Sequence, residues 1–222
     1  VAARVRMKSP DTWLHLDAVQ SVGYLPLRPD AWGIDSLTLS SHKIHGPRGT
    51  GVLALYREAS LVPLIAGGGQ EGGRRSGTQN LPAIAGTALA LEKARTSLSQ
   101  AGRIAGLRDR LITRIRSEVR DMKINGDPDK GLPHILSISF AGLIGEVLLH
   151  HLEKEGIMVS TGSACHAGWK DVSETLKALK VPPRFARGTI RISLSELTTE
   201  EEIDYTADTL VYQVAYLRKI GL

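Results

Sequence analysis

The sequence predicts an α/β fold, and two observations carry that prediction. Short apolar, β-leaning runs lie at residues 12–20, 34–40 and 51–56, and the first two end in polar or glycine-rich residues. Longer segments follow in which apolar residues recur at helical spacing, first after Pro82 and then over 104–119. Strands that alternate with helices are typical of α/β proteins, whose ligand sites lie at strand ends.

At the start of the chain, residues 1–7 carry no helix-capping signal, and a strand is expected within a few residues of them. Residues 66–78 are too rich in glycine to sustain a helix or a strand and are expected to form a loop. A domain boundary is expected near residues 99–102, which divides the chain into 1–100 and 101–222.

The second part is expected to combine helices with a small sheet. Residues 125–133 indicate a surface turn, and 135–140 and 188–194 alternate in hydrophobicity like half-buried strands. Residues 145–155 predict a short helix. The last helix begins at Thr199-Glu200-Glu201-Glu202, a capping-box pattern with acidic residues at the positive helix end.

Composition excludes several classes of protein. With 222 residues, 42% of them hydrophobic, the chain is long enough for one large or two modest domains. The net charge of +5 comes from scattered lysines and arginines, so we expect no nucleic-acid partner. No apolar stretch is long enough for a membrane span, and no signal peptide is visible. One cysteine excludes an intrachain disulfide and fits a cytoplasmic location, and no metal site is expected.

Two residues at predicted strand ends suggest cofactor chemistry. Lys43 lies where a strand ends and a glycine-proline turn begins, and Asp17 ends the strand upstream. Most lysines are solvated surface charges. A lysine that forms an imine and a carboxylate that holds a pyridinium nitrogen are, however, the two groups that pyridoxal phosphate (PLP) chemistry requires.

Three further features each allow two interpretations. The glycine-rich loop is either a flexible linker or, with Arg75 and Thr78, an anion-binding turn. Cys165 is either a small buried residue or, between small residues and beside His166, an accessible nucleophile with a lowered thiol pKa. Arg191, in an alternating strand, is either a surface charge or a bidentate ligand for a carboxylate.

Four motifs, in order along nearly the whole chain, resemble those of the cysteine desulfurases of the NifS/IscS type. They are Asp17-Ala18-Val19-Gln20-Ser21, Ser40-x-His42-Lys43-x-x-Gly46-Pro47-Arg48-Gly49, Arg75-Ser76-Gly77-Thr78 and Gly162-Ser163-Ala164-Cys165. The resemblance implies the C-terminal part of a fold-type-I PLP-dependent transferase, similar to aspartate aminotransferase. Residues 1–100 would then be the C-terminal half of the large PLP-binding domain of a three-layer sandwich, and 101–222 a small α+β domain carrying the cysteine loop.

The resemblance also implies roles for individual residues. Lys43 matches the lysine that binds PLP covalently, and Asp17 the partner of the pyridine nitrogen. Gln20 matches the residue that hydrogen-bonds the phenolic oxygen of PLP. Ser40 and His42 match phosphate contacts. The threonine that matches Thr78 reaches, in the family, across a homodimer to the phosphate of the partner subunit's PLP.

For the substrate, the resemblance implies that Arg191 binds the carboxylate of L-cysteine and that Cys165 takes its sulfur as a persulfide, leaving L-alanine. The distance from Cys165 to Arg191 is typical of the members with a long cysteine loop. The family delivers sulfur to acceptor or iron–sulfur scaffold proteins. A metal does not take part.

Two alternatives stay open. Selenocysteine lyases are close relatives, and residues 68–71 and 164–166 also resemble that branch. Alternatively, the chain is a catalytically incomplete fragment. Family members carry a substantial segment ahead of the part that matches this chain, including the histidine that stacks on the PLP ring, so the chain is expected to lack the first half of the protein.

Overall fold

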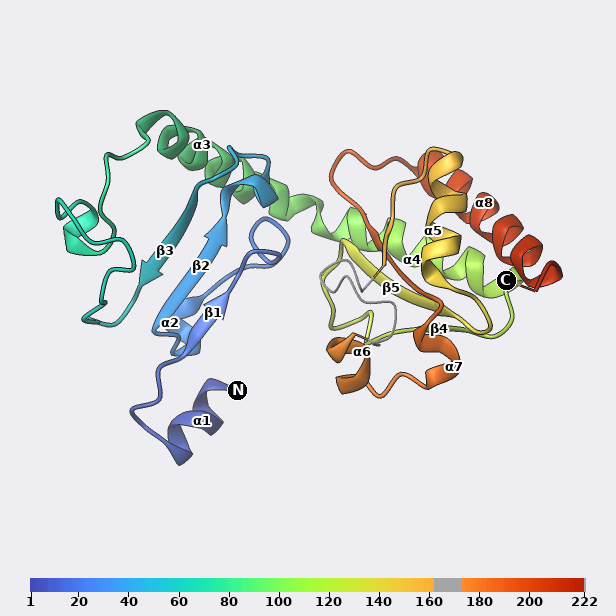
Figure 1. Ribbon diagram of the computed structural model, residues 1–222, viewed down its shortest axis with the longest axis horizontal. Helices are drawn as coiled ribbons and strands as arrows, with labels where there is room; N and C mark the ends of the chain where they lie inside the picture. The colour runs from blue at the N-terminus through green and yellow to red at the C-terminus, as the bar shows by residue number, and fades with distance from the viewer. Residues whose placement is uncertain (162–172, 222) are drawn as a thin grey trace. The chain divides into compact units, whose positions relative to one another are not determined.

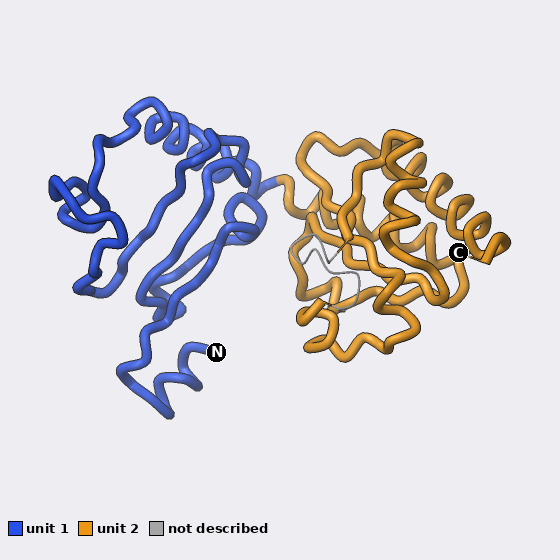
Figure 2. Tube along the Cα trace, viewed as in Figure 1, with its two compact units in different colours: residues 1–99 blue, residues 100–222 orange. Residues whose placement is uncertain are grey.

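The computed structural model describes residues 1–161 and 173–221. Contacts within the chain divide it into two units, residues 1–99 (unit 1) and 100–222 (unit 2), shown in Figure 2. The identification of these units as parts of a large and a small domain stays a prediction.

Unit 1 is built on a three-stranded sheet in the order β1-β2-β3 (Figure 1). The strands are β1 (His15–Asp17), β2 (Ser36–Ser40) and β3 (Gly51–Leu55). β1 and β2 run parallel, joined by a long connection that contains the short helix α2 (Pro29–Trp32), whereas β3 returns antiparallel to β2. Long connections of this kind are what parallel neighbours require.

The first element of unit 1 differs from the expectation. Residues Ala2–Lys8 form helix α1 instead of leading straight into a strand. The helix has no side-chain cap and no buried residue, so its own sequence supports it weakly. A tertiary contact holds it: the guanidinium of Arg6 donates to the carboxylate of Asp35 at 2.5 Å. A pattern along the sequence does not reveal this contact.

The first strand is also shorter than expected, since only His15–Asp17 of residues 12–20 are paired. The backbone turns after Asp17, whose Oδ1 accepts the N–H of Val19 at 3.0 Å. A carboxylate that bonds the backbone two residues ahead favours a turn over a continued strand.

Helix α3 (Leu81–Ser97) covers the turn that follows β2. Its first turn contains Pro82, and the side chain of Asn80 caps it by accepting the N–H of Ala83 at 3.2 Å. Ala90 and Ala94 pack against Ile44 of the 3-10 turn η1 (Ser41–Ile44). The expected helix after Pro82 is therefore confirmed, and it fixes the turn that carries Lys43.

The glycine-rich segment before α3 is a loop, as expected, with one 3-10 turn, η2 (Glu71–Gly73). Several of its glycines have left-handed backbone angles that other residues adopt only with strain. They are Gly67, Gly69, Gly72, Gly73 and Gly77. A 3-10 turn, η3 (Leu98–Gln100), follows α3.

Unit 2 contains an antiparallel sheet in the order β4-β5-β7-β6. The strands are β4 (Met122–Ile124), β5 (Ile135–Phe140), β6 (Ser160–Thr161) and β7 (Thr189–Ser193). The helices are α4 (Ala101–Glu118), α5 (Gly145–Lys154), α6 (Glu174–Ala178), α7 (Pro183–Ala186) and α8 (Glu200–Lys219). The strands expected at 135–140 and 188–194 are confirmed.

The long helices α4 and α8 pack together beside this sheet (Figure 1). Their apolar stripes are buried, with Ile104, Leu111 and Ile115 from α4 and Leu210 and Leu217 from α8 fully inaccessible. The expected capping box is present, since Thr199 accepts the N–H of Glu202 and the carboxylate of Glu202 accepts the N–H of Thr199. The α/β class is thus confirmed.

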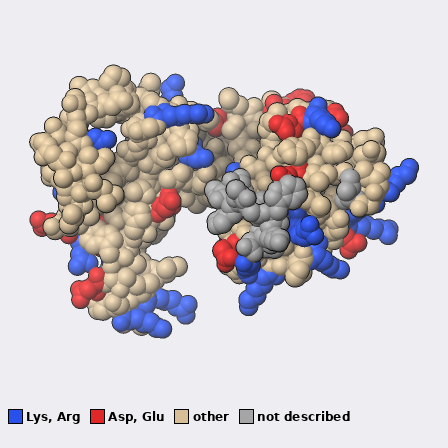
Figure 3. Space-filling view, viewed as in Figure 1, with Lys and Arg blue, Asp and Glu red and all other residues tan. Residues whose placement is uncertain are grey.

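The surface agrees with the scattered charge seen in the sequence. On the face that Figure 3 shows, lysine and arginine side chains stand at several separate places. Within residues 1–161 and 173–221, no helix is long and apolar enough to cross a lipid bilayer.

Candidate cofactor and active site

The carboxyl ends of the parallel strands β1 and β2 bring the predicted cofactor residues of unit 1 to one edge of the sheet. Asp17 is the last residue of β1 and lies opposite Thr38 of β2. Ser40 ends β2, and the turn η1 follows at once with His42 and Lys43. Such edges are where ligands bind in open α/β sheets.

The turn after β1 holds Asp17 at this edge. Its Oδ1 accepts the N–H of Val19 at 3.0 Å, and the buried Ala18 donates its own N–H to the carbonyl of Thr38 at 2.9 Å. The carboxylate of Asp17 stays exposed. Gln20 lies in the same turn and is half-buried. The segment is therefore anchored on β2 while its acidic group faces outward.

The turn after β2 presents Lys43 and His42 in a similar way. Both side chains are exposed. The Nδ1 atom of His42 lies 2.9 Å from the hydroxyl of Ser40. Ser41 is buried and ties the turn down, because its N–H donates to Thr50 at 3.1 Å and its carbonyl accepts from Gly46 at 2.9 Å.

The sequence pattern missed three polar residues beside this edge. His15, Ser36 and Thr38 lie next to one another on the face of β1 and β2 that carries Asp17, and their side chains are hydrogen-bonded. A signal was present in the sequence, since polar side chains recur at every second residue of both strands. The apolar residues between them masked it.

A buried carboxylate supports the opposite end of β1. Asp35 lies beside Arg6 and Arg57 and accepts the N–H of Leu14 at 2.7 Å. This backbone N–H, together with the two guanidinium groups, holds the pKa of Asp35 below its usual value. Asp35 thus joins α1 to the strands without reaching the candidate site.

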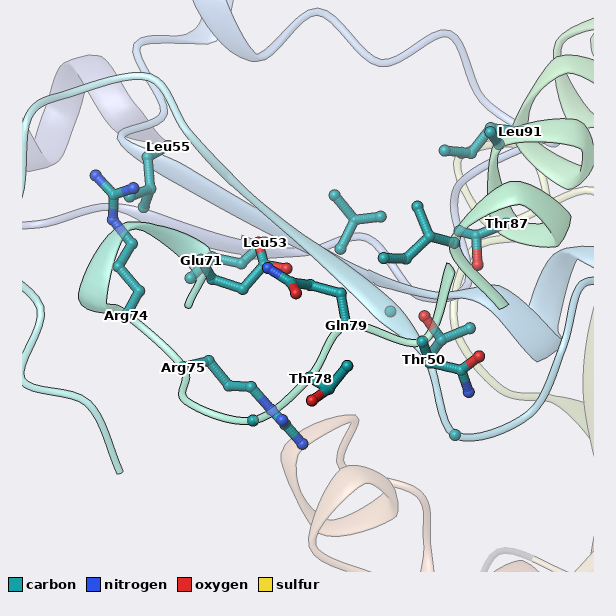
Figure 4. Close-up of a pocket in the computed structure, with 17 residues that line it drawn as sticks. Thr50, Leu53, Leu55, Glu71, Arg74, Arg75, Thr78, Gln79, Thr87 and Leu91 are labelled. Carbon is teal, nitrogen blue, oxygen red and sulfur yellow. The ribbon is translucent and has the colours of Figure 1, made fainter. Parts of the chain in front are cut away.

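Thr78 lies away from these residues along the chain, in a pocket of about 940 Å³ between the glycine-rich loop, β3 and α3. Figure 4 shows Thr78 beside Arg75, with Thr87 and Leu91 on α3. The N–H groups of Ser76 and Gly77 already donate to Ile65 and to the side chain of Gln70. Backbone anion capture at those two amides is therefore not supported.

In unit 2, Arg191 lies on β7 and pairs in register with Ser137 of β5 and Ser160 of β6. Its side chain is exposed, and its Nη2 donates to the hydroxyl of Ser160 at 3.4 Å. The alternating pattern that predicted the strand is confirmed, since Ile190 and Ile192 are buried. The guanidinium is thus free of the core and accessible to a carboxylate.

A buried histidine lies near Arg191. His134 precedes β5, is only 4% exposed and accepts the N–H of Leu194 at its backbone carbonyl. Burial, with a smaller contribution from the charge of Arg191, lowers the pKa of His134 to about 4. His134 is therefore uncharged at neutral pH.

Cys165 lies outside the described residues, so its role stays a prediction. The adjacent His150 and His151 on α5 have separate partners, since Nδ1 of His150 approaches Glu153 at 3.3 Å and that of His151 donates to Gln213 at 3.0 Å.

The residues at the edge of the unit 1 sheet fit PLP by their chemistry. The ends of the two parallel strands and the turn after β2 carry a primary amine, a carboxylate, a hydroxyl and an imidazole. These groups belong to Lys43, Asp17, Ser40 and His42. PLP offers an aldehyde for the amine, a ring nitrogen for the carboxylate and a phosphate for the hydroxyl and the imidazole. These residues therefore match the aldehyde, the ring nitrogen and the phosphate of the cofactor.

Similarity to known proteins agrees with this chemistry. The sequence is 40% identical over 215 residues to the cysteine desulfurase IscS of Dictyoglomus turgidum, covering 96% of this chain and 55% of that protein. It is 42% identical over 208 residues to the cysteine desulfurase NifS of Azotobacter vinelandii, covering 93% and 52%. The chain thus spans about half the length of the curated relatives it matches.

Solved structures give the same result for the fold. A NifS-like protein superposes with a TM-score of 0.86 at 37% identity, covering 96% of this chain and 55% of the other. A NifS-like protein from Rickettsia africae superposes with a TM-score of 0.79 at 28% identity, covering 96% and 56%. The predicted PLP-dependent transferase fold is confirmed by this likeness.

The family assignment covers nearly the whole sequence. Residues 2–206 match the aminotransferase class-V family, a span that includes the strand-end residues and Arg191. This chain therefore belongs to the class V aminotransferases, a family of PLP-dependent enzymes.

Proposed function

We propose that this chain is the part of a PLP-dependent cysteine desulfurase that carries the lysine and aspartate for the cofactor and the cysteine that accepts sulfur. One observation carries the proposal: the register of β1 on β2 brings Asp17 and the Ser40–Lys43 turn to the same sheet edge. The names of the relatives support the choice of reaction among those that the family performs.

In unit 1, the proposed roles follow from the groups that the edge presents. PLP, when bound, supplies an electron sink for an amino-acid substrate. Asp17 holds the proton at the ring nitrogen, because its carboxylate faces outward and is fixed by the N–H of Val19. Lys43 supplies the amine. Ser40 and His42 donate to the phosphate, and Gln20 to the phenolic oxygen.

In unit 2, the proposed roles concern the substrate. The guanidinium of Arg191 orients L-cysteine by its carboxylate, a geometry that its planar fork suits. The thiolate of Cys165 attacks the sulfur of that cysteine. The C–S bond of the substrate breaks, a persulfide remains on Cys165, and the three-carbon remainder takes up a proton and leaves as L-alanine.

The wider setting is part of the same proposal. We infer a homodimer in which Thr78 serves the cofactor phosphate of the partner subunit, a cytoplasmic location, and delivery of the persulfide sulfur to an acceptor or iron–sulfur scaffold protein. The glycine-rich loop that carries Thr78 supports the homodimer, since the loop is exposed and extends from the sheet and α3.

The absorption spectrum of the purified chain with PLP tests the proposal. We expect a visible band that Lys43→Ala abolishes, because the band depends on the amine. The exposed Lys93 on α3 gives the matched control, and Lys93→Ala should keep the band. Conversion of L-cysteine to L-alanine is then measured on the same preparations.

The outcomes separate the alternatives. A Lys43-dependent band with alanine formation from L-cysteine supports a desulfurase. A band without any turnover of L-cysteine supports the alternative of a catalytically incomplete fragment, and faster turnover of L-selenocysteine assigns the chain to the lyases. If no Lys43-dependent band forms, the chain is not an enzyme by itself.

A further inference from the structure

One face of the parallel pair β1 and β2 carries polar side chains only. The face comprises His15, Asp17, Ser36, Thr38 and Ser40. Leucines occupy the opposite face, at Leu16, Leu37 and Leu39. Parallel strands normally read as apolar on both faces. A polar face of this kind therefore points to a function for its residues. In the proposed function, only Asp17 and Ser40 have a role.

The inner residues of this face form a chain of hydrogen bonds. The indole Nε1–H of Trp13 donates to the hydroxyl of Ser36 at 2.8 Å. The same hydroxyl lies 2.8 Å from Nδ1 of His15, and Nε2 of His15 lies 3.1 Å from the hydroxyl of Thr38. Trp13 and His15 belong to the β1 segment, whereas both hydroxyls belong to β2. Each of these three hydrogen bonds therefore joins the β1 segment to β2.

The donors and acceptors available give these bonds a consistent direction. An indole nitrogen only donates, so the Ser36 oxygen accepts from Trp13 and is free to donate its hydrogen to Nδ1 of His15. With the ring hydrogen on Nε2, His15 then donates to the hydroxyl of Thr38. In this arrangement each of the three bonds has one donor and one acceptor.

The hydrogen bonds of the His15 imidazole hold β1 against β2 close to the proposed cofactor residues. Both ring nitrogens are engaged by β2, so His15 ties the two strands together two residues before Asp17. Thr38, which His15 contacts, lies directly opposite Asp17 and two residues before Ser40. A side-chain tie at this point limits sliding and separation of the two strand ends that carry the proposed cofactor residues.

We propose that His15 is a positioning residue for the cofactor site. Acting through Ser36 and Thr38, it holds the end of β1 against β2, so that the carboxylate of Asp17 keeps a constant place relative to Ser40 and Lys43. The proposal rests on the proposed function, because it concerns the same PLP site. His15 itself need not touch the cofactor.

Nuclear magnetic resonance of ¹⁵N-labelled histidine in the chain without PLP tests the geometry. We expect the Nε2–H form for His15 and a mixture of forms in Ser36→Ala, which removes the hydrogen that Nδ1 accepts. His150, exposed and bonded only to Glu153 among the side chains described, is the internal reference and should not change. A mixture of the two ring forms in the wild-type chain, which indicates an imidazole without fixed partners, overturns the inference.

Binding of PLP itself tests the function. We expect His15→Ala and Thr38→Val each to weaken PLP about tenfold, the effect of one lost hydrogen bond, and to shift the pH at which the Lys43-dependent band changes. The double variant should be no worse than either single one, because both break the same tie. His15→Gln, whose amide N–H can reach Thr38, should recover part of the affinity. His150→Ala is the matched control.

Each result decides between the two proposals. Unchanged PLP affinity and band in His15→Ala, or effects of His15→Ala and Thr38→Val that simply add, overturn the positioning role while the proposed function stands. A lower unfolding temperature with unchanged PLP affinity shows a purely structural role and overturns it as well. If the wild-type chain gives no Lys43-dependent band, the proposed function fails and this role fails with it.

Discussion

The hydroxyl groups of Ser41 and Thr87 are hydrogen-bonded at 3.0 Å across 46 residues of chain. Ser41 is fully buried and Thr87 is 4% exposed, and both lie beside the cluster of Ile44, Ala90 and Ala94. This bond fastens the turn that carries Lys43 to helix α3. Because it is buried, its loss is more costly than that of a surface bond.

We predict that Thr87→Val lowers the free energy of unfolding by about 1–3 kcal/mol, the cost of a buried hydroxyl left without its partner. Denaturant unfolding followed by circular dichroism gives the value. The double variant Ser41→Ala/Thr87→Val should be more stable than Thr87→Val, since no hydroxyl is then left unsatisfied. A double variant that is less stable by the sum of both single effects would contradict this explanation.

We predict that acid destabilises the fold through His134. The folded pKa of about 4 lies below the unfolded value of about 6.5, so the unfolded chain binds the proton more readily. The stability is complete above pH 6.5 and declines as the pH falls towards 4, by up to about 3 kcal/mol.

His134→Gln, which does not titrate, should remove this decline, although its stability at neutral pH is expected to be lower. Denaturant midpoints at several pH values between 7 and about 4.5 give the comparison with the wild-type chain. Parallel curves for the two proteins would show that His134 is not responsible.

We predict that the ion pairs between α4 and α8 contribute modestly to the stability of the fold. Arg110 holds Asp204 by two hydrogen bonds of 2.9 and 2.7 Å, and these bonds lower the pKa of Asp204. The contribution is present above the usual pKa of an aspartate and is lost as the pH falls through the lowered value. Asp204→Asn should reduce the melting temperature by about 1–3 °C at neutral pH.

Thermal unfolding at low and high salt checks this prediction. The difference in melting temperature between the wild-type chain and Asp204→Asn should shrink in about 1 M salt, because exposed charges are screened. The exposed Glu118 at the end of α4 gives the control, and Glu118→Gln should change the melting temperature less. Equal shifts for the two variants would argue against a specific role of the Arg110–Asp204 pair.

We predict that Arg191→Gln raises the KM for L-cysteine by about 30-fold, the effect of losing a charged bidentate contact worth about 2 kcal/mol. The kcat should change less, because the guanidinium binds the substrate carboxylate rather than the reacting sulfur. Steady-state kinetics give both constants. Arg116→Gln, at an exposed position on α4, is the control. A loss confined to kcat would exclude the proposed role.

We predict that Cys165→Ala keeps the Lys43-dependent PLP band and loses sulfur transfer by about a thousandfold, the scale expected for removal of a nucleophile. Absorption spectra and alanine formation without added thiol give the two readings. Release of sulfide or alanine at the wild-type rate in this variant would contradict the role of Cys165.

Much of the local structure was predictable from neighbouring residues. The capping box at Thr199, the helix that follows Pro82 and the apolar stripe of α4 depend on groups within one or two helical turns, and the structure confirms them. The stripe includes Val119, although the helix ends at Glu118 and Val119 is its C-cap. Helix ends are set by single hydrogen bonds and shift by one residue easily.

The sequence by itself determined the family, the longer helices and several of the strands, and the residues expected to serve the cofactor, because motifs and periodicity are local. The tertiary structure decided which of these residues meet. The register of Asp17 on Thr38, the bond from Ser41 to Thr87, the tie of His15 to β2 and the contact of Arg6 with Asp35 each join distant segments. Such contacts form only when the chain folds, so no pattern along the sequence records them.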